Sequence, residues 1–387
     1  MRILHVIASL DPRGGGPMEG VRQIARVAHG LGHQTTVVSL DCPGAAFLEG
    51  NSFRAVPLGP AYLKYHYTPR LVPWLRAHAR EFDVVIVNGI WQYSSFGVWR
   101  ALRGGRVPYF VFPHGMLDPY FKRAFPLKHL KKWLYWPWAE YRALRDARAV
   151  LFTCEEERML ARRSFWLYRC KEEVVGYGTA PPAFEREAAE AAFFAAFPML
   201  KDLRIVLFLS RIHEKKGCDL LIEAFAAIAG SDPRWHLVLA GPAEERLAAR
   251  LRMRAQALGV AERITWPGML AGIQKWGALY AAEVFALPSH QENFGIAVAE
   301  ALACGTPVLI SDKVNIWREI DADGAGLVEP DTASGACQLL RRWNGLDMVA
   351  REQMRVQARA CFENRFDIRR VAAGIVGRIQ RLANGRS

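Results

Sequence analysis

The sequence predicts an α/β protein built from two doubly wound parallel sheets, and three observations support this prediction. With 387 residues, the chain is longer than one ordinary hydrophobic core requires. Short apolar runs of strand length alternate with segments of helix length along most of the chain. Glycine and proline interrupt this alternation between residues 174 and 184, after which it begins again. We therefore place a domain boundary near residue 180.

The first half, residues 1–180, starts with a strand-like run at 2–10, a glycine loop at 11–20 and a segment at 21–33 whose apolar residues recur at helical spacing. Basic or turn-rich segments of helix length separate the later apolar runs. Alternation of this kind predicts a parallel sheet with helices on both faces. The further strand-like runs are 34–40, 83–89, 108–115 and 149–154.

The second half, residues 181–365, repeats the alternation and predicts a second doubly wound sheet. Ligands of such sheets bind at the carboxyl ends of the strands, so two sheets that face each other would form an interdomain cleft. The remaining residues, 366–387, follow Phe362 and Phe366 and are expected to form an amphipathic basic helix. The strand-like runs of the second half are 203–211, 235–242, 263–268, 284–289 and 307–312, and its helix-like segments are 217–229, 245–259 and 274–283.

Composition restricts the class of protein. Lys and Arg number 51 and Asp and Glu 38, a net charge of +13 that favours nucleic acid, an anionic bilayer or phosphorylated ligands. The seven cysteines are scattered and form no C-x-x-C pair, which argues against a disulfide framework or a zinc site. We find neither an export signal nor an apolar run of about 18 residues, so we expect a cytoplasmic chain that does not cross the membrane.

The strongest functional signal is the stretch from Ser289 to Asp312. Glu292 is expected in a loop, while Asn293, Phe294 and Gly295 would present backbone amides at the positive end of a helix, where a diphosphate fits. Glu300 follows eight residues after Glu292, a helical rise of about 12 Å. The two acids would thus hold opposite ends of one sugar nucleotide.

A purely structural alternative exists for this stretch. Glu292 would then be a charge that favours the helix dipole, and Glu300 a solvated side chain. That alternative explains neither Gly295 nor the turn at Gly305, Thr306 and Pro307.

Three weaker signals lie at the ends of predicted strands. Gly14, Gly15 and Gly16 could let backbone amides approach a phosphate beside a helix N-terminus, although a plain turn has the same composition. Arg211 and Lys216 follow a strand and could hold a diphosphate, or form a solvated basic turn.

His114 also ends a strand. An imidazole at that place could contact a phosphate or a sugar hydroxyl, or could be a structural histidine.

Five segments together resemble the retaining glycosyltransferases of family 4, which have the two-domain GT-B fold. They are "SRIHEKKG", "LAGP", "WPGML", "PSHQENFGIAVAEALACGTPVL" and "GLVEP". The likeness is close within residues 205–330 and looser before them. It implies two Rossmann-like domains that face each other across a cleft. It also implies that the last helix, 366–387, returns to the N-terminal domain, with hinges near residues 180 and 365.

The resemblance implies roles for individual residues. Glu292 matches the acid that binds the donor sugar, Glu300 the acid that binds the ribose, and Arg211 with Lys216 the pair that neutralises the diphosphate. His114 matches the histidine beside the transferred sugar. The remaining matches to donor-binding positions are Gly15, Gly16, Gly241, Gly268, Met269, Leu270, Asn293, Phe294 and Gly295.

The chemistry implied is the transfer of a sugar from a nucleoside diphosphate with retention of configuration. Cations and helix amides would stabilise the charge that gathers on the leaving diphosphate, so neither a metal ion nor a cofactor is expected. The donor could carry UDP or GDP.

The segment 121–148 mixes basic and aromatic residues in a pattern that suits a membrane interface, and a core-packed helix with solvated lysines is the alternative. With "PHGMLDP" before it, it resembles bacterial exopolysaccharide and O-antigen transferases. This implies a polyprenyl-diphosphate-linked saccharide acceptor and peripheral binding to the inner face of the plasma membrane. The residues concerned are Phe121, Lys122, Arg123, Phe125, Lys128, Lys131, Lys132, Trp133, Tyr135, Trp136 and Trp138.

Two other classes of function stay open. A sugar-nucleotide epimerase or a phosphorylase also has the GT-B fold, although a phosphorylase needs a lysine-bound pyridoxal group that we cannot place. A nucleic-acid-binding protein would suit the net charge. No helix-turn-helix, zinc or RNA-recognition motif occurs, and two carboxylates would repel a phosphate backbone, so we expect no nucleic-acid partner.

Overall fold

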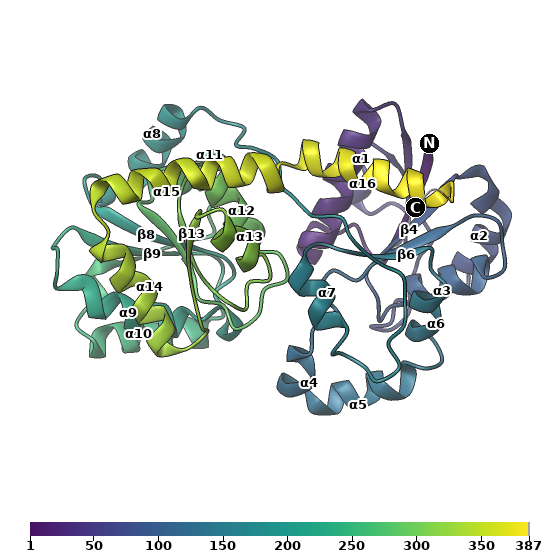
Figure 1. Ribbon diagram of the computed structural model, residues 1–387, viewed down its shortest axis with the longest axis horizontal. Helices are drawn as coiled ribbons and strands as arrows, with labels where there is room; N and C mark the ends of the chain where they lie inside the picture. The colour runs from purple at the N-terminus through teal and green to yellow at the C-terminus, as the bar shows by residue number, and fades with distance from the viewer. Residues whose placement is uncertain (386–387) are drawn as a thin grey trace. The chain divides into compact units, whose positions relative to one another are not determined.

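The computed structural model describes residues 1–385, except for the surroundings of Gly14 and the side chain of Arg123, so the candidate role of Gly14 lies outside the described residues. The chain forms two compact units (Figure 1). Unit 1 comprises Met1–Gly178 and the chain from Ile368 onward, and unit 2 comprises Thr179–Asp367. The helix at the end of the chain therefore belongs to the same unit as the N-terminus.

Unit 1 contains a seven-stranded sheet in which every neighbouring pair is parallel. Its order is β3-β2-β1-β4-β5-β6-β7, so the chain moves outward from β1 in one direction and then in the other. This is the doubly wound arrangement. The strands are β1 (Arg2–Ile7), β2 (Gln34–Ser39), β3 (Arg54–Pro57), β4 (Val84–Asn88), β5 (Tyr109–Phe112), β6 (Ala149–Phe152) and β7 (Glu172–Val174).

Helices connect these strands, and the last helix of the chain lies against the first (Figure 1). The apolar residues of this last helix, among them Val371, Ile375 and Ile379, are buried, which explains why the segment folds onto unit 1. The helices are α1 (Gly16–Gly30), α2 (Leu71–His78), α3 (Tyr93–Leu102), α4 (Tyr120–Ala124), α5 (Pro126–Tyr135), α6 (Glu140–Arg145), α7 (Glu155–Ala161) and α16 (Ile368–Ala383).

Unit 2 contains a six-stranded parallel sheet in the order β10-β9-β8-β11-β12-β13. The strands are β8 (Arg204–Leu209), β9 (Trp235–Ala240), β10 (Ile264–Gly268), β11 (Val284–Leu287), β12 (Val308–Ser311) and β13 (Gly326–Glu329). The helices are α8 (Arg186–Ala196), α9 (Cys218–Ala229), α10 (Glu245–Ala257), α11 (Gly272–Ala281), α12 (Ile296–Ala303), α13 (Trp317–Ala322), α14 (Ala333–Gly345) and α15 (Met348–Cys361), followed by the π-helical turn η7 (Phe362–Phe366).

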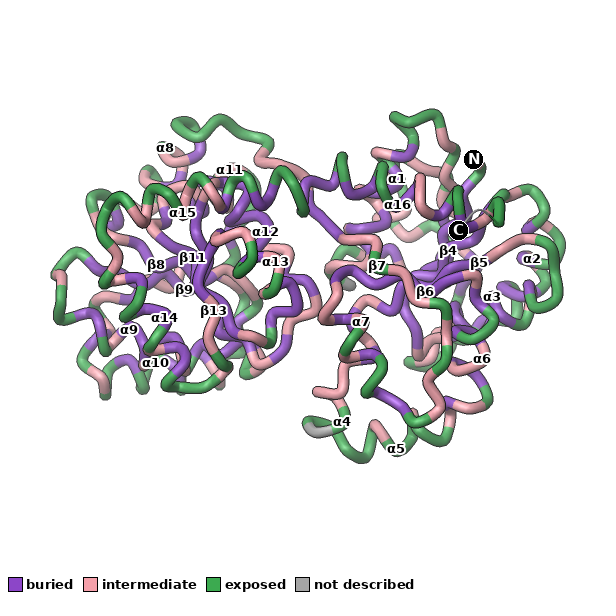
Figure 2. Tube along the Cα trace, viewed as in Figure 1, coloured by how far each residue is buried: buried purple, intermediate pink, exposed green. Residues whose placement is uncertain are grey.

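The predicted fold class, an α/β protein with two doubly wound parallel sheets, is confirmed. The central strands are buried in both units (Figure 2). β4, for example, is buried along its whole length, because helices cover both faces of such a sheet and a strand within it must be apolar throughout.

The boundaries differ from expectation in two places. The helix expected at 21–33 begins at Gly16, five residues earlier, because Pro17 suits the first turn of a helix. The helix in the stretch 289–312 begins only at Ile296. The expected 12 Å of helical rise between Glu292 and Glu300 is therefore wrong, since half of that stretch lies in a loop.

Candidate functional site

The carboxyl ends of all the strands of unit 2 lie at one edge of its sheet, because the strands are parallel. The strand order reverses between β8 and its neighbour β11, and a crevice for ligands is expected at such a point. Arg211 and Lys216 follow β8, and Glu292 follows β11. The sequence therefore places these three residues on the two loops that flank the switch point.

Hydrogen bonds join these strand-end loops to one another. The Ser289 hydroxyl and the His290 amide both donate to the carbonyl of Lys215, at 2.9 and 2.8 Å, which ties the loop after β11 to the loop after β8. The Ile212 amide donates to the carbonyl of Pro242 at 2.9 Å and ties the loop after β8 to that after β9. The edge is thus a connected backbone framework.

Within this framework, Lys216 forms an ion pair with Glu292. Lys216 is buried, and the turn that carries it is fixed by Gly217, whose φ is +67°. A Cβ atom at Gly217 would lie 2.1 Å from the carbonyl oxygen of Pro288, so only glycine permits this approach. The two residues that the resemblance assigns to diphosphate and sugar are therefore in direct contact.

Arg211 differs from Lys216 in its surroundings. Its side chain is exposed, and within residues 1–385 it has no hydrogen-bond or ion-pair partner. The guanidinium carries five donors, and it is available to an anionic group at this edge.

The N-terminus of α12 lies directly after Glu292. The backbone of Glu292 is held on both sides, because its amide donates to Lys313 and its carbonyl accepts from Asn315, at 2.9 and 3.0 Å. Gly295 caps the helix with a φ of +77° and supplies no side-chain hydrogen bond to the first turn. The Val298 amide donates to the Gly295 carbonyl at 2.9 Å, whereas Gly295 has no side chain to cap the amides before it, which leaves a suitable place for an anion.

The other two residues before the helix differ from each other in their contacts. The side-chain oxygen of Asn293 accepts a hydrogen bond from the side-chain amide nitrogen of Asn315 at 3.4 Å. Phe294 is buried, and its ring meets Phe366 edge to face with centroids 5.6 Å apart. Phe294 thus anchors the helix start to η7.

Glu300 is buried within α12, and its carboxylate binds the ammonium of Lys275 on α11 at 2.7 Å. The alternative that treats Glu300 as a solvated side chain is therefore wrong. A carboxylate held in this way has a fixed orientation and keeps lone pairs for further donors. Sequence reasoning missed Lys275, although a single lysine among the apolar residues of α11 was a usable signal.

The expected donor-binding glycines of the middle loops have different environments. Gly241 has a φ of +143°, and a Cβ atom there would lie 1.8 Å from the carbonyl oxygen of Ser210. Its amide donates to the carbonyl of Gly268 at 2.7 Å, which joins the ends of β9 and β10. After Gly268 the side chain of Met269 is exposed, whereas that of Leu270 is buried.

In unit 1, Gly15 and Gly16 lie between β1 and the first turn of α1. Gly15 has a φ of +82° and forms the N-cap without a side-chain hydrogen bond, and no heavy atom lies within 4 Å of the position of its Cβ. The loop therefore has the open backbone expected of an anion cradle.

His114 directly follows Pro113 at the end of β5 and is half-buried. Its Nε2 lies 3.4 Å from the Asn88 side-chain oxygen, and the Asn88 amide nitrogen lies 3.1 Å from Nδ1 of His5. Burial, with a smaller contribution from His5, lowers the pKa of His114 to about 3, so the imidazole is neutral near pH 7. Its φ of +49° is rare for a residue other than glycine, and such backbone strain is concentrated at functional sites.

Tyr177 and Glu157, which sequence reasoning missed, hold this part of unit 1 together. The Tyr177 hydroxyl donates to the carbonyl of Gly16 at 2.9 Å, and its ring meets that of His114 edge to face at 5.9 Å. The carboxylate of Glu157 accepts from the amide of Gly115 at 2.6 Å. The glycine loop and His114 thus share one neighbour, Tyr177, and its place in "GYG" was the only available signal.

The basic aromatic segment 121–148 divides into an exposed and a buried part. No residue of α5 is buried, which does not fit the core-packed alternative for that helix. Trp136 and the face of α6 that includes Ala143 are buried. The side chain of Arg123, which we included in the basic cluster, lies outside the described residues.

Residues 1–385 lack the features of a metal centre and of a membrane span. No group of three or more His, Cys, Asp and Glu side chains has an arrangement that could hold a metal ion. Asp323, which forms an Asp-x-Asp pair with Asp321, has both carboxylate oxygens 2.7 Å from the guanidinium of Arg365. No helix in this part of the chain has the length and hydropathy that a membrane span requires.

Comparison with family models gives two matches, one in each unit. Residues 15–178 match the model of the glycosyl transferase 4-like domain, and residues 191–356 match that of glycosyl transferases group 1. The two matches include every candidate site residue named above except Gly14, since Gly15, Gly16 and His114 lie in the first and the strand-end residues of unit 2 in the second.

Similar proteins agree with these matches. The mannosylfructose-phosphate synthase of Agrobacterium fabrum is 32% identical over 123 residues, 30% of this chain and 27% of that protein's length. Another relative is the GDP-mannose:cellobiosyl-diphosphopolyprenol alpha-mannosyltransferase of Xanthomonas campestris. Its sequence is 24% identical over 336 residues, which cover 85% of this chain and 83% of the relative's length. The solved structure of sucrose-phosphate synthase from Thermosynechococcus elongatus superposes with a TM-score of 0.76 at 22% identity, covering 100% of both chains.

Proposed function

This chain belongs to the family 4 glycosyltransferases with the GT-B fold, and we propose that it moves a sugar, with retention of configuration, from a nucleoside diphosphate to a lipid-linked saccharide. The observation that carries the proposal is the cluster at the end of β8 and β11. There Arg211, a cation with no partner among residues 1–385, and the Lys216–Glu292 ion pair lie on loops joined by hydrogen bonds next to the start of α12.

This arrangement suits the bond that must break. The link between the anomeric carbon and the donor diphosphate breaks while negative charge collects on the phosphate oxygens. Arg211, Lys216 and the first amides of α12 are positioned to stabilise that charge, as an oxyanion hole does. A diphosphate bound there would share Lys216 with Glu292, whose carboxylate would accept hydrogen bonds from the sugar hydroxyls.

The new bond forms from an acceptor hydroxyl to the anomeric carbon on the face that the diphosphate leaves. The hydroxyl proton passes to the leaving phosphate, so the products are the glycosylated acceptor and a nucleoside diphosphate. No protein nucleophile is needed, and no metal enters this proposal. A neutral His114 would contact the sugar by a hydrogen bond and would not act as a cation.

We assign the ribose to Glu300. Because Lys275 fixes one oxygen of its carboxylate at 2.7 Å, the other lone pairs keep a defined direction for two ribose hydroxyls. The loop Gly268–Leu270, at the end of the next strand but one from β8, would then lie near the base.

A lipid-linked acceptor has separate support. The Xanthomonas campestris relative, which aligns with most of this chain, acts by its name on a diphosphopolyprenol-linked disaccharide. The exposed helix α5 offers Leu127, Leu130 and Leu134 on one face, because these positions are three and four residues apart. Lys128 and Lys131 accompany them, a combination suited to the inner surface of an anionic membrane.

Release of nucleoside diphosphate tests the proposal, with UDP-sugars and GDP-sugars offered beside a lipid-linked disaccharide. We expect turnover with one base, and a fall of about 10²-fold or more in Lys216→Ala because a donor to the developing charge is lost. Lys201→Ala, which removes an exposed lysine of the same unit, is the control and should keep full activity. Full activity of Lys216→Ala would overturn the assignment, and donor conversion without any acceptor product would indicate an epimerase.

A further inference from the structure

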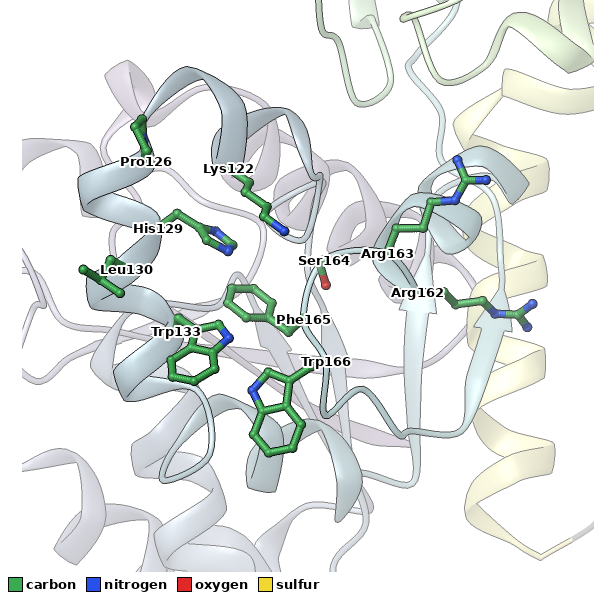
Figure 3. A pocket seen from close by; sticks show the side chains of 10 residues that line it. All are labelled: Lys122, Pro126, His129, Leu130, Trp133, Arg162, Arg163, Ser164, Phe165 and Trp166. Atoms are coloured by element: carbon green, nitrogen blue, oxygen red, sulfur yellow. The ribbon is translucent and has the colours of Figure 1, made fainter.

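Unit 1 has a cavity of about 800 Å³ between α5 and the segment after α7 (Figure 3). The proposed transfer of sugar at the strand ends does not use it. Its size lies within the range of pockets that bind small molecules. The lining residues are Lys122, Pro126, His129, Leu130, Trp133, Arg162, Arg163, Ser164, Phe165 and Trp166.

Aromatic rings form one side of the cavity. Phe165 is buried, stacked on Trp136 with centroids 4.4 Å apart and on His129 at 4.9 Å. Trp133 and Trp166 lie next to each other at its mouth, with centroids 6.1 Å apart (Figure 3). Trp166 is 66% exposed, although an indole of that size is normally covered in a folded protein. These rings offer a large apolar surface to a ligand.

The other side of the cavity is positively charged. Lys122 extends toward Ser164 across the cavity (Figure 3), and within the described residues neither Lys122 nor Arg163 has an ion-pair partner. Arg162 is already paired with Glu172. No acidic residue lines the cavity, so two cations are uncompensated. A ligand that satisfies both sides must be anionic at one end and apolar along the rest.

The apolar side continues onto the surface of α5. Leu130 lines the cavity and also belongs to the row Leu127, Leu130 and Leu134, whose members are 79%, 56% and 62% exposed. A hydrocarbon chain that leaves the cavity over Leu130 would therefore meet further apolar side chains, those of Leu127 and Leu134. Because the apolar surface extends beyond the cavity, it favours a ligand with a long hydrocarbon chain over a compact sugar phosphate.

We propose that this cavity binds the prenyl phosphate portion of one acceptor lipid, with the phosphates on Lys122 and the chain along Trp133, Trp166 and Leu130. The proposal rests on the proposed function, because it identifies where the lipid part of that acceptor lies. It commits to a single lipid molecule held in a pocket, which differs from adsorption of α5 on a bilayer.

Calorimetric titration of the full chain with farnesyl diphosphate tests the proposal. UDP or GDP at saturating concentration in the calorimeter cell keeps farnesyl diphosphate away from the proposed donor site. Farnesol and inorganic diphosphate serve as the separate halves of the probe. We expect farnesyl diphosphate to bind at least 10-fold more tightly than either half, because the cavity contacts both parts.

Matched variants locate the site. Trp166→Ala and Lys122→Ala should each weaken binding of farnesyl diphosphate at least 5-fold. Trp138→Ala removes an equally exposed indole, 68% exposed, that does not line the cavity, and Lys64→Ala removes an exposed lysine of unit 1 that does not line it. Both controls should bind the probe as the unchanged protein does.

Three outcomes would overturn the proposal. Equal affinity for inorganic diphosphate would indicate a simple phosphate site. Equal loss in Trp138→Ala and Trp166→Ala would indicate nonspecific contact with the prenyl chain. Binding of anionic vesicles without binding of farnesyl diphosphate would indicate a bilayer surface only.

The test is separate from that of the proposed function. If donor turnover depends on Lys216 and the probe does not bind, only the lipid assignment fails. If the probe binds as described and no donor is turned over, only the proposed transfer fails.

Discussion

Two glycines at the strand ends of unit 2 allow very different amounts of space for a side chain. Gly241 has a φ of +143° with Ser210 directly against it, whereas Gly268 has a φ of +73° and open space around its Cβ position. Gly241 therefore permits the close approach of two loops, while Gly268 only permits a turn. Gly241 is thus required because a Cβ atom would clash with Ser210, whereas Gly268 is favoured only because of its positive φ.

We expect Gly241→Ala to destabilise unit 2 by about 2–4 kcal/mol, since the new methyl would lie 1.8 Å from a carbonyl oxygen. Gly268→Ala should cost only about 1 kcal/mol, from its positive φ alone. Thermal unfolding of the two variants in parallel measures the difference. Equal melting temperatures would show that the close approach at Gly241 is not required.

A buried carboxylate in unit 1 predicts a dependence of stability on pH. Glu140 is fully buried; one oxygen accepts from the Trp91 amide and the Ser95 hydroxyl, and within residues 1–385 the other has no partner. Burial raises the pKa of Glu140 from 4.5 to about 7. A raised pKa means that the folded protein favours the protonated form of Glu140. The contribution of this form to the free energy of unfolding is complete below pH 4.5 and is lost as pH rises through 7.

Glu140→Gln removes the loss of stability with rising pH, because the amide does not ionise, and it keeps an acceptor for Trp91 and Ser95. Relative to the unchanged protein, the variant should gain about 3 kcal/mol between pH 4.5 and pH 7.5. Melting temperatures of both proteins across this range, taken in one buffer series, give the difference. A difference that does not change with pH would contradict the buried, protonated carboxyl.

The location of the strand-end residues was predictable from the sequence, and their partners were not. Arg211 and Glu292 could be placed because each directly follows an apolar run that forms a strand. The ion pair of Lys216 with Glu292 joins residues 76 positions apart, and it depends on β8 and β11 being neighbours in the sheet. Neither segment predicts which strands are neighbours in the sheet, so the ion pair could not be predicted from the sequence.

At the scale of elements, the central strands were predictable and the edge strands of the first sheet were not. β4 and β5 are buried throughout and read as continuous apolar runs. β3 (Arg54–Pro57) and β7 (Glu172–Val174) form the two edges of the first sheet, are only partly buried and contain charged residues. Because one side of an edge strand faces solvent, its sequence lacks the apolar signal.

Helix α5 predicts a separation between membrane binding and stability. Leu127→Ser and Leu134→Ser together should abolish flotation with anionic vesicles, because they remove two members of the exposed leucine row. Stability should stay within about 0.5 kcal/mol, since no residue of α5 is buried. Leu31→Ser, at a 51% exposed leucine after α1, is the control and should float normally. Flotation of the double variant at the level of the unchanged protein would contradict the interfacial role.

At the scale of the whole molecule, the chain passes between the two units twice, after Gly178 and after Asp367. The two passages are hydrogen-bonded, because the Thr179 amide donates to the carbonyl of Phe366 at 3.0 Å and Thr179 pairs with Asp367. The hinges expected near residues 180 and 365 lie within three residues of these passages, and their motion stays a prediction. Each unit contributes its own set of candidate residues, and the net charge of +13 favours substrates that carry phosphate.

We propose above all that the strand ends of β8 and β11 bind a nucleoside diphosphate. Calorimetric titration with UDP, GDP and ADP, in the unchanged protein and in Arg211→Ala, Lys216→Ala and Lys201→Ala, measures this binding most directly. We expect that at least one nucleotide binds, that each of the first two variants weakens nucleotide binding at least 10-fold, and that Lys201→Ala leaves nucleotide binding unchanged. Binding that is unaffected by the loss of both Arg211 and Lys216, or no binding of any of the three nucleotides, would contradict it.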